Sequence, residues 1–330
     1  MKKITIAAVA AFALATGSAS AADLVTKAKP IVAPDPPAWD LAFGSAIASD
    51  YVFRGITQSN RQPSVAAYFE PRYNINKDNQ LYLGVGGASI SFPNRAAGEI
   101  DFYGGWRPTV GAFAFDFGAW YYWYPRGQCF GSQAQGSMQT CTNVGFLGGP
   151  TLLPNGNAIK DNLSFYEIYG KVNYTVNDNI VLGAYAYWSP SVLNSGASGV
   201  FFGGTAKYTW AAFANGVAPY ISGEVGHWSL GTSDAFYGIA GTALAGGIPY
   251  KDYTTWNAGF GWTWKVFTVD LRYIDTNLNK GDCNAFTSDH TAGAGTAITT
   301  INPTGVSSKW CSGTFVARLS ADLTVNTNLK

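Results

Sequence analysis

The sequence predicts an all-β protein: a transmembrane antiparallel up-and-down β-barrel of about 12 strands, with short turns at one end and long loops at the other. Three observations predict it. Apolar and polar residues alternate with a period of two from Trp39 onward, and the connections between the alternating segments switch between short and long. The composition is 15% aromatic and only 12% charged, whereas an average soluble domain has roughly 25% charged residues.

The charge balance excludes one class of partner. The net charge of +1 over 330 residues includes no basic excess of the kind that neutralises phosphates. We therefore expect no nucleic-acid partner. The low charge also argues against an ordinary cytoplasmic enzyme.

The N-terminus has the pattern of an export signal. Lys2 and Lys3 precede an apolar run, and small residues lead up to Ala21. This pattern predicts a cleaved signal peptide over residues 1–21. The alternative, a membrane anchor, needs roughly 20 apolar residues, more than this run provides.

A proline-rich segment follows the signal. Residues 22–38 hold four prolines and almost no periodicity, which predicts an unstructured periplasmic tether. Residues 39–330 form the predicted barrel, and no segment of 18 consecutive apolar residues occurs there. An exported chain of this kind is either a soluble β protein or an outer-membrane barrel.

The alternating segments are about as long as tilted membrane-crossing strands. In one of them Phe113, Phe115 and Phe117 lie on one face and Asp116 on the other. At Gly86-Gly87 the parity of the apolar residues switches, which predicts a bulge. The predicted strands are 39–55, 62–74, 80–92, 98–110, 112–124, 162–174, 179–189, 203–213, 219–230, 251–264, 266–276 and 312–325.

A soluble sandwich would also alternate, so the connections and the aromatic residues favour the barrel. The odd-numbered connections are about 6, 5, 37, 13, 20 and 35 residues long, and the even-numbered ones about 5, 1, 4, 5 and 1. Aromatic residues are expected at both ends of the lipid-facing surface. Tyr51, Tyr121, Trp123 and Trp188 are predicted near the long loops, and Trp39, Tyr73, Trp210, Trp262 and Trp264 near the short turns.

Charged residues share the face opposite the apolar one, which predicts that they line the lumen. The predicted basic lining is Arg54, Arg72, Arg107, Lys171, Lys207, Arg272 and Arg318. The predicted acidic lining is Asp50, Glu70, Glu99, Asp101, Asp116, Glu167, Glu224, Asp270 and Asp322.

This mixed lining suits a water-filled path, so the expected function is passive diffusion of small polar solutes or ions, with no cofactor and no metal. The first alternative is that opposite charges pair across the lumen and plug a structural barrel. The second is a hydrolase that uses Asp289 and His290, next to Ser288. Neighbours in sequence rarely have the required geometry, and we expect no enzyme.

The four cysteines all fall in long connections and allow three pairings. Local pairing of Cys129 with Cys141 and of Cys283 with Cys311 is favoured, because each bond would then staple one exposed loop in an oxidising compartment. A metal site is the rival interpretation, but the spacing lacks paired CxxC motifs or nearby histidines.

Residues 50–60 read DYVFRGITQSN, and PSV at 63–65 and IDFYGG at 100–105 follow. These stretches resemble the TorF-type porin family of Gram-negative bacteria. The resemblance implies a barrel in the cell outer membrane and defines no binding-site residues. Expected partners are outer-membrane lipid and lipopolysaccharide, the outer-membrane insertion machinery and small polar solutes. Assembly as a homo-oligomer is left open.

Overall fold

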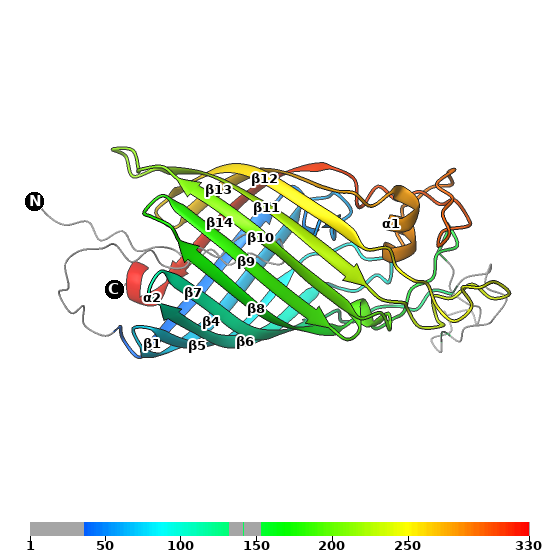
Figure 1. Ribbon diagram of the computed structural model, residues 1–330, viewed down its shortest axis with the longest axis horizontal. Coiled ribbons are helices and arrows are strands. Elements are labelled where there is room, and N and C mark those ends of the chain that lie inside the picture. The colour runs from blue at the N-terminus through cyan, green and yellow to red at the C-terminus, as the bar shows by residue number, and fades with distance from the viewer. Residues whose placement is uncertain (1–35, 132–140, 142–152, 330) are drawn as a thin grey trace, which may run out of the picture.

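The computed structural model describes residues 36–131, 141 and 153–329, which form a closed antiparallel β-barrel of twelve strands (Figure 1). The predicted fold class is therefore confirmed. The predicted signal peptide and residues 22–35 of the tether lie outside the described residues, so both stay predictions.

Each wall strand pairs with its neighbours in chain order, and β1 closes the barrel by pairing with both β4 and β14. Two further short strands, β2 and β3, pair only with each other. The wall consists of β1 (Trp39–Ala48), β4 (Ser64–Asn76), β5 (Asn79–Ala88), β6 (Glu99–Val110), β7 (Phe113–Trp123), β8 (Phe165–Thr175), β9 (Ile180–Ser189), β10 (Gly199–Thr209), β11 (Ala218–Leu230), β12 (Tyr253–Trp264), β13 (Phe267–Thr276) and β14 (Thr314–Thr324).

The two ends of the barrel differ, as the alternating connection lengths predict. The short-turn end has connections 77–78, 111–112, 176–179, 210–217 and 265–266. The long-loop end has 49–63, 89–98, 124–164, 190–198, 231–252 and 277–313. Helix α1 (Lys280–Thr287) and the 3-10 turn η2 (Val192–Asn194) lie at the long-loop end, whereas α2 (Val325–Asn328) follows β14 at the short-turn end (Figure 1).

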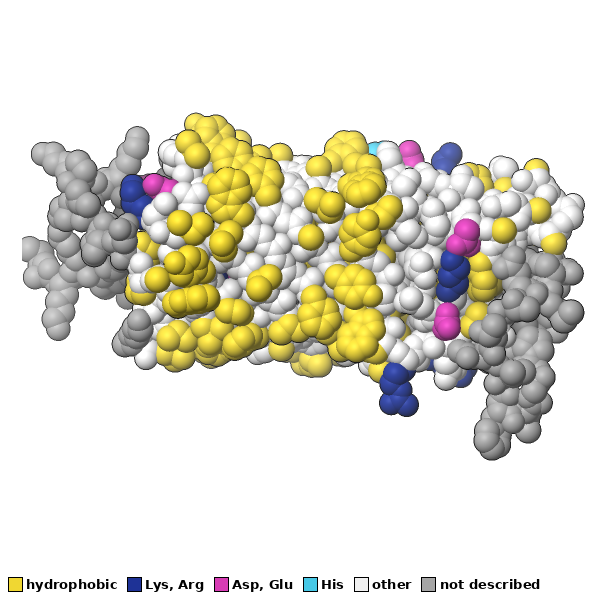
Figure 2. Space-filling view, turned by 90° about the horizontal axis from the view of Figure 1, so that it is seen from below, with side chains coloured by type: hydrophobic (Ala, Val, Ile, Leu, Met, Phe, Trp, Pro, Cys, Tyr) yellow, Lys and Arg dark blue, Asp and Glu magenta, His cyan; other side chains and the backbone are white. Residues whose placement is uncertain are grey.

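Alternation along each strand separates an apolar exterior from a polar interior. On β8, Tyr166 and Ile168 are 45% and 52% exposed, whereas Glu167 and Tyr169 between and beside them are buried. Figure 2 shows apolar side chains spread over the strand-bearing part of one face, with charged side chains only towards the ends. In the described part of the chain, no helix is long and apolar enough to span a membrane.

The predicted strand ends are wrong at two places near the long loops and at one near the short turns. The segment 39–55 ends as a wall strand at Ala48, and the chain then turns inward. Tyr51 is consequently buried and belongs to no exterior aromatic belt. The predicted strand 203–213 begins four residues earlier, at Gly199, and ends at Thr209.

The predicted bulge at Gly86-Gly87 is also wrong. Both glycines keep a continuous register with β4 and β6. The apparent change of parity arises because β5 ends at Ala88, so that Ile90 and Phe92 belong to a loop. Phe92 is buried there by packing against other loops.

Candidate functional site: the lumen and its inward hairpin

A hairpin formed by β2 (Val52–Phe53) and β3 (Ile56–Thr57) folds into the barrel. Its two-residue turn has positive φ at both positions, 48° at Arg54 and 82° at Gly55. This is the backbone of the type I′ turn, whose twist matches that of the paired strands. Gly55 is also required for space, because a Cβ there would collide with Thr276 and Thr255.

The tip of this hairpin places a buried cation in the lumen. The Arg54 guanidinium donates two hydrogen bonds of 2.7 Å to the Glu167 carboxylate on β8. Its Cζ atom lies 4.4 Å from the ring centroids of both Phe201 and Trp228. The Tyr253 hydroxyl donates to the Arg54 carbonyl at 2.9 Å. Bidentate pairing offsets much of the cost of burying two charges.

The hairpin segment meets the wall on all sides. Through hydrogen bonds, ring contacts or shared apolar clusters, residues 51–54 join residues from every strand of the wall. These are Ala48 of β1, Ala66 of β4, Ala88 of β5, Glu99 of β6, Tyr122 of β7, Glu167 of β8, Tyr187 of β9, Phe201 of β10, Trp228 of β11, Tyr253 of β12, Ile274 of β13 and Val316 of β14. The hairpin therefore occupies the cross-section of the lumen at its level.

Buried carboxylates hold the base of the hairpin. Asp50 accepts hydrogen bonds from the hydroxyls of Thr57 and Ser59, and burial raises the pKa of its carboxyl group above the usual value. Glu99 accepts from the Tyr51 hydroxyl at 2.6 Å and from the Tyr124 hydroxyl at 2.8 Å. These bonds fix residues 50–59 to one another and to β6.

Closer to the short-turn end, charged residues of β4, β6, β7 and β8 form a first network on the wall. Arg107 pairs with Glu70 at 2.8 Å and with Asp116 at 3.5 Å. Arg72 also pairs with Glu70, at 2.6 Å, and Lys171 lies 4.0 Å from Asp116. Asp116 lies on the strand between those of Arg107 and Lys171, whereas Arg107 reaches Glu70 across β5, so the pairs run around the wall.

A second network lies on the wall formed by β11, β12 and β13. Arg272 donates to both carboxylate oxygens of Asp270 at 3.0 Å and to the Ser222 hydroxyl at 2.8 Å. Asn257 accepts from Arg272 and donates to Glu224 at 3.1 Å. The first network holds three basic and two acidic side chains, and the second holds one basic and two acidic side chains.

The residues predicted to line the lumen reach the barrel interior by two routes, and their role in lining a conducting path stays a prediction. Asp50 and Arg54 enter through the hairpin segment. The others occupy the inward face of wall strands. Asp101 is fully buried, and Asp322 accepts from Tyr68 at 3.2 Å. Lys207 lies 4.3 Å from the Tyr220 ring, and Arg318 is half-buried on the same face as Asp322.

The sequence prediction omitted the lumen tyrosines. Tyr82 donates to Asp116, Tyr185 to Glu224, and Tyr220 to Asp270 at 2.7 Å. Each hydroxyl shares the lumen with the carboxylate that it binds. The alternation of strand faces could have revealed such tyrosines. Tyr169, whose hydroxyl bonds to that of Tyr82, lies on the same face of β8 as Glu167 and Lys171.

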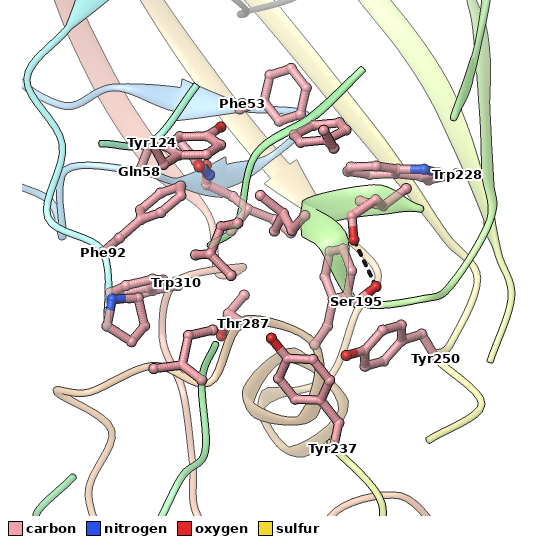
Figure 3. Close-up of a pocket in the computed structure, with 18 residues that line it drawn as sticks. Phe53, Gln58, Phe92, Tyr124, Ser195, Trp228, Tyr237, Tyr250, Thr287 and Trp310 are labelled. Carbon is pink, nitrogen blue, oxygen red and sulfur yellow. Dashed lines mark hydrogen bonds between the residues drawn. The ribbon is translucent and has the colours of Figure 1, made fainter. Parts of the chain in front are cut away.

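Towards the long-loop end, an apolar pocket lies next to the hairpin. It encloses about 700 Å³ of empty volume, part of which is open to solvent. Phe53 and Ile56 of the hairpin contribute to its wall, together with residues of the long loops (Figure 3). The loops around it form the main buried apolar cluster of the protein.

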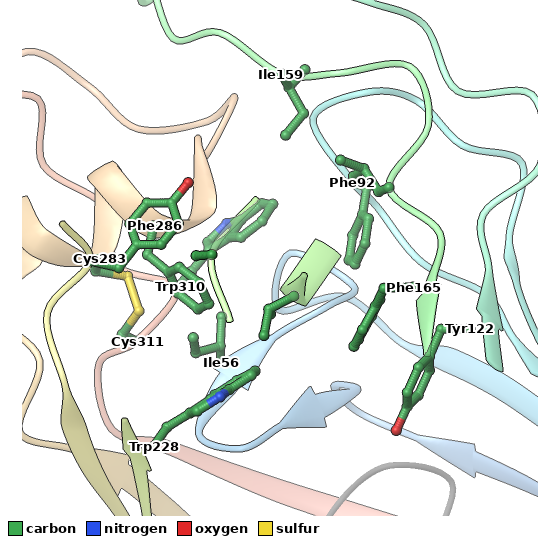
Figure 4. Packing of buried hydrophobic residues seen from close by; sticks show 14 of the residues in the cluster. Ile56, Phe92, Tyr122, Ile159, Phe165, Trp228, Cys283, Phe286, Trp310 and Cys311 are labelled. Carbon is green, nitrogen blue, oxygen red and sulfur yellow. A yellow bond between two sulfur atoms is a disulfide. The ribbon is translucent and has the colours of Figure 1, made fainter. Parts of the chain in front are cut away.

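Two disulfides fasten the long loops, Cys129–Cys141 and Cys283–Cys311, which is the pairing that the sequence analysis favours. The second joins α1 to the segment that carries Trp310, so that Phe286 and Trp310 enter the same apolar cluster (Figure 4). In the described part of the chain, no three His, Cys, Asp or Glu side chains group as metal ligands would.

The residues of the alternative hydrolase do not assemble. Asp289 accepts hydrogen bonds from Thr291 and, at 2.7 Å, from the Ser308 hydroxyl. His290 instead packs edge-on against Trp310, with ring centroids 5.7 Å apart, and burial lowers its pKa. Within the described residues no hydrogen bond joins Asp289 to His290, so a catalytic dyad is not formed in this structure.

Comparison with known families finds one match. The model of a family described as "Bacterial protein of unknown function (Gcw_chp)" matches residues 33–163, which is fewer than half of the 330 residues. The chain is similar to this family over that region. No curated protein matches the sequence, and the TorF-type resemblance stays a prediction.

Solved structures with a similar fold include outer-membrane proteins. The COG4313 outer membrane channel from Pseudomonas putida F1 has 12% identity and a TM-score of 0.40, over 88% of this chain and 96% of that one. LpxR from Salmonella typhimurium has 10% identity and a TM-score of 0.39, over 86% and 99%. The KdgM porin has 8% identity and a TM-score of 0.39, over 86% of this chain and 98% of that one. Similarities this low do not assign a function.

Proposed function

We propose that this protein is an outer-membrane channel for small polar solutes or ions, and that the structure represents its closed state, with the hairpin of β2 and β3 as the barrier. Solute moves down its own gradient, with no cofactor and no chemical step. Two features support placement in lipid. The exterior of the strands is apolar, and the barrel is closed, so every strand has its backbone hydrogen-bond partners within the membrane.

The observation that carries the proposal is the charged wall between the hairpin and the short-turn end. The side chains of Arg107 and Lys171 are 26% and 22% exposed, and that of Asp116 is 15% exposed. Charges that only held the barrel together would be expected to exclude water. Partly exposed charges of both signs can exchange hydrogen bonds with water and with a passing polar solute.

The hairpin is a removable barrier because it belongs to a connection. Residues 49–63 join β1 to β4 at the long-loop end, and the wall closes without them. For the hairpin to leave the lumen, the Arg54–Glu167 pair, the Tyr253–Arg54 hydrogen bond and the ring contacts of Phe53 must separate, and both charges then regain water. No wall strand has to unpair.

A structural barrel with a permanently filled lumen is the second candidate. The contacts of residues 51–54 around the whole wall favour it. The two candidates differ in one measurable respect, because a structural barrel passes no ions under any condition that leaves it folded.

Conductance of the refolded mature chain in planar bilayers, under a salt gradient, separates the two. We expect discrete openings with a weak cation preference, because the predicted lumen acids outnumber the bases only slightly and salt screens the difference. Heat-modifiable migration on gels serves as the control for folding. The structural barrel would be assigned if folded, inserted protein shows no conductance. The same must hold for a Glu167→Gln variant, in which the Arg54–Glu167 pair is weakened.

A further inference from the structure

The apolar pocket at the long-loop end is a chemical environment unlike the charged lumen wall. Nine of its eighteen lining residues are aromatic and none is charged. Figure 3 shows labelled side chains from the hairpin and several loops arranged around a hollow.

Three polar side chains around the hollow are engaged elsewhere, whereas the buried indole N–H of Trp228 has no hydrogen-bond partner among the described residues. The Gln58 side-chain amide donates to the Ile56 carbonyl at 2.8 Å. The hydroxyls of Ser195 and Thr287 donate to the carbonyls of Val192 and Cys283, at 2.6 and 2.8 Å. A ligand that needs hydrogen bonds from these groups would have to break bonds that the protein already makes.

The rings present both faces and edges. Phe286 meets Trp228 and Tyr250 edge-on, with centroids 5.6 and 5.0 Å apart. Phe92 and Tyr124 lie at a shallower angle of 31°, with centroids 4.9 Å apart. A planar ring placed among such neighbours gains offset-stacked and edge-to-face contacts beyond simple apolar burial.

From this environment we infer that the pocket binds a neutral aromatic molecule. The lining residues provide no cation, so the carboxylate of a fatty acid would be left without a charged partner there. A sugar would find too few open donors and acceptors. The inference goes beyond the proposed channel, although Phe53 and Ile56 of the hairpin belong to both the barrier and the pocket wall.

Photolabelling tests the site without any need for conduction. Refolded mature protein in detergent is irradiated with benzophenone, a neutral aromatic probe, and the labelled peptides are mapped by mass spectrometry. Mapping separates the pocket from labelling of the detergent-covered exterior. We expect saturable labelling of peptides that contain pocket residues, and competition by excess naphthalene but not by dodecanoate or glucose.

Leu193 offers a matched pair of variants. It lines the pocket with φ of 49°, a conformation that Asp tolerates, so Leu193→Asp places a carboxylate in the pocket with little backbone cost. Ile298→Asp makes the same chemical change at a loop position that is 69% exposed and outside the pocket. We expect about tenfold weaker labelling for Leu193→Asp, because an apolar ring in the pocket would remove water from the half-buried carboxylate. No change is expected for Ile298→Asp.

Leu193→Trp reduces the free volume without adding charge, and is expected to weaken labelling as well. Heat-modifiable migration shows whether each variant has folded. Equal labelling of the pocket in wild type and in folded Leu193→Asp and Leu193→Trp would overturn the site, as would the absence of saturable labelling. Stronger competition by dodecanoate than by naphthalene would overturn the ligand class. None of these outcomes depends on whether the barrel conducts.

Discussion

The two halves of the lumen are filled in different ways. Near the long loops, a hairpin from a connecting segment crosses the barrel and buries Arg54 against Glu167, with both side chains 3% exposed or less. Near the short turns, charged residues of the wall pair with one another around the wall and keep partial contact with solvent, as Arg107 does. One half is closed by a segment that the wall does not need; the other is lined by the wall itself.

This difference indicates where closure is decided. Removing charges from the wall changes the chemistry of a path, whereas releasing the hairpin changes whether a path exists.

The largest effect is expected from Glu167→Ala. It leaves the Arg54 guanidinium buried without its carboxylate partner, a change that typically costs about 3–5 kcal/mol. Because the hairpin can leave the lumen without unpairing the wall, we expect local release. Hydrogen exchange at residues 51–57 should speed up by at least about a hundredfold, the equivalent of roughly 3 kcal/mol.

Two variants control this experiment. Glu167→Gln keeps one acceptor for Arg54 and should release the hairpin less. Asp178→Ala removes an acid from the short turn 176–179, remote from the hairpin, and should leave exchange at 51–57 unchanged. Unaltered exchange in folded Glu167→Ala would show that the ion pair does not hold the hairpin.

The next largest effect is expected from removing the disulfide Cys283–Cys311. In the chain-entropy model a loop closed over 28 residues is worth about 3–4 kcal/mol. The paired Cys283→Ala, Cys311→Ala variant should therefore loosen α1 and Trp310, which proteolysis of the folded barrel would detect as cleavage within 277–313. Resistance equal to that of wild type would show that apolar packing suffices.

A smaller effect is expected from Arg272→Gln on the wall. The change removes one positive charge beside Asp270, so the reversal potential should move towards cation preference. In a solvated, screened path one charge is worth about 0.5 kcal/mol, or roughly a twofold change in permeability ratio. Lys77→Gln, at a side chain 67% exposed in a short turn, should give no comparable shift. Equal shifts in both variants would contradict a lumen role for Arg272.

The smallest effect concerns pH. Burial lowers the pKa of His290, with Asp289 opposing the shift and Arg95 adding to it. A lowered pKa in the folded state means that the unfolded loop binds protons more readily below about pH 6.5. The 277–313 loop should therefore lose stability as the pH falls from 6.5 through the lower folded-state pKa. Hydrogen exchange in that loop should show the decline in wild type, and His290→Gln should remove it.

Period-two patterning predicted most of the wall because strand faces impose it. Glu167, Asp270 and their counterparts were assigned to the lumen from parity alone. Parity could not reveal that residues 49–57 leave the wall, because Val52 and Phe53 continue an apolar pattern whether they face lipid or fill a lumen. The Arg54-Gly55 turn was a visible signal, since Gly commonly occupies the second position of a type I′ hairpin.

The apolar pocket was beyond prediction for a different reason. Its walls come from separate loops, such as Ile159, Val192 and Phe286, which are far apart in sequence and meet only in three dimensions. Local patterns carry no information on how irregular loops pack against one another. The disulfide partners were easier, because local pairing is a short-range constraint.

The central claim is that the hairpin closes a channel. Single-channel conductance should be compared between the mature protein and a variant in which Val52–Thr57 is replaced by six Gly and Ser residues, which keeps the length of the 49–63 connection. Brief openings in wild type and sustained, larger conductance in the folded variant are predicted. Equal conductance in the two, or silence in both, would contradict the account.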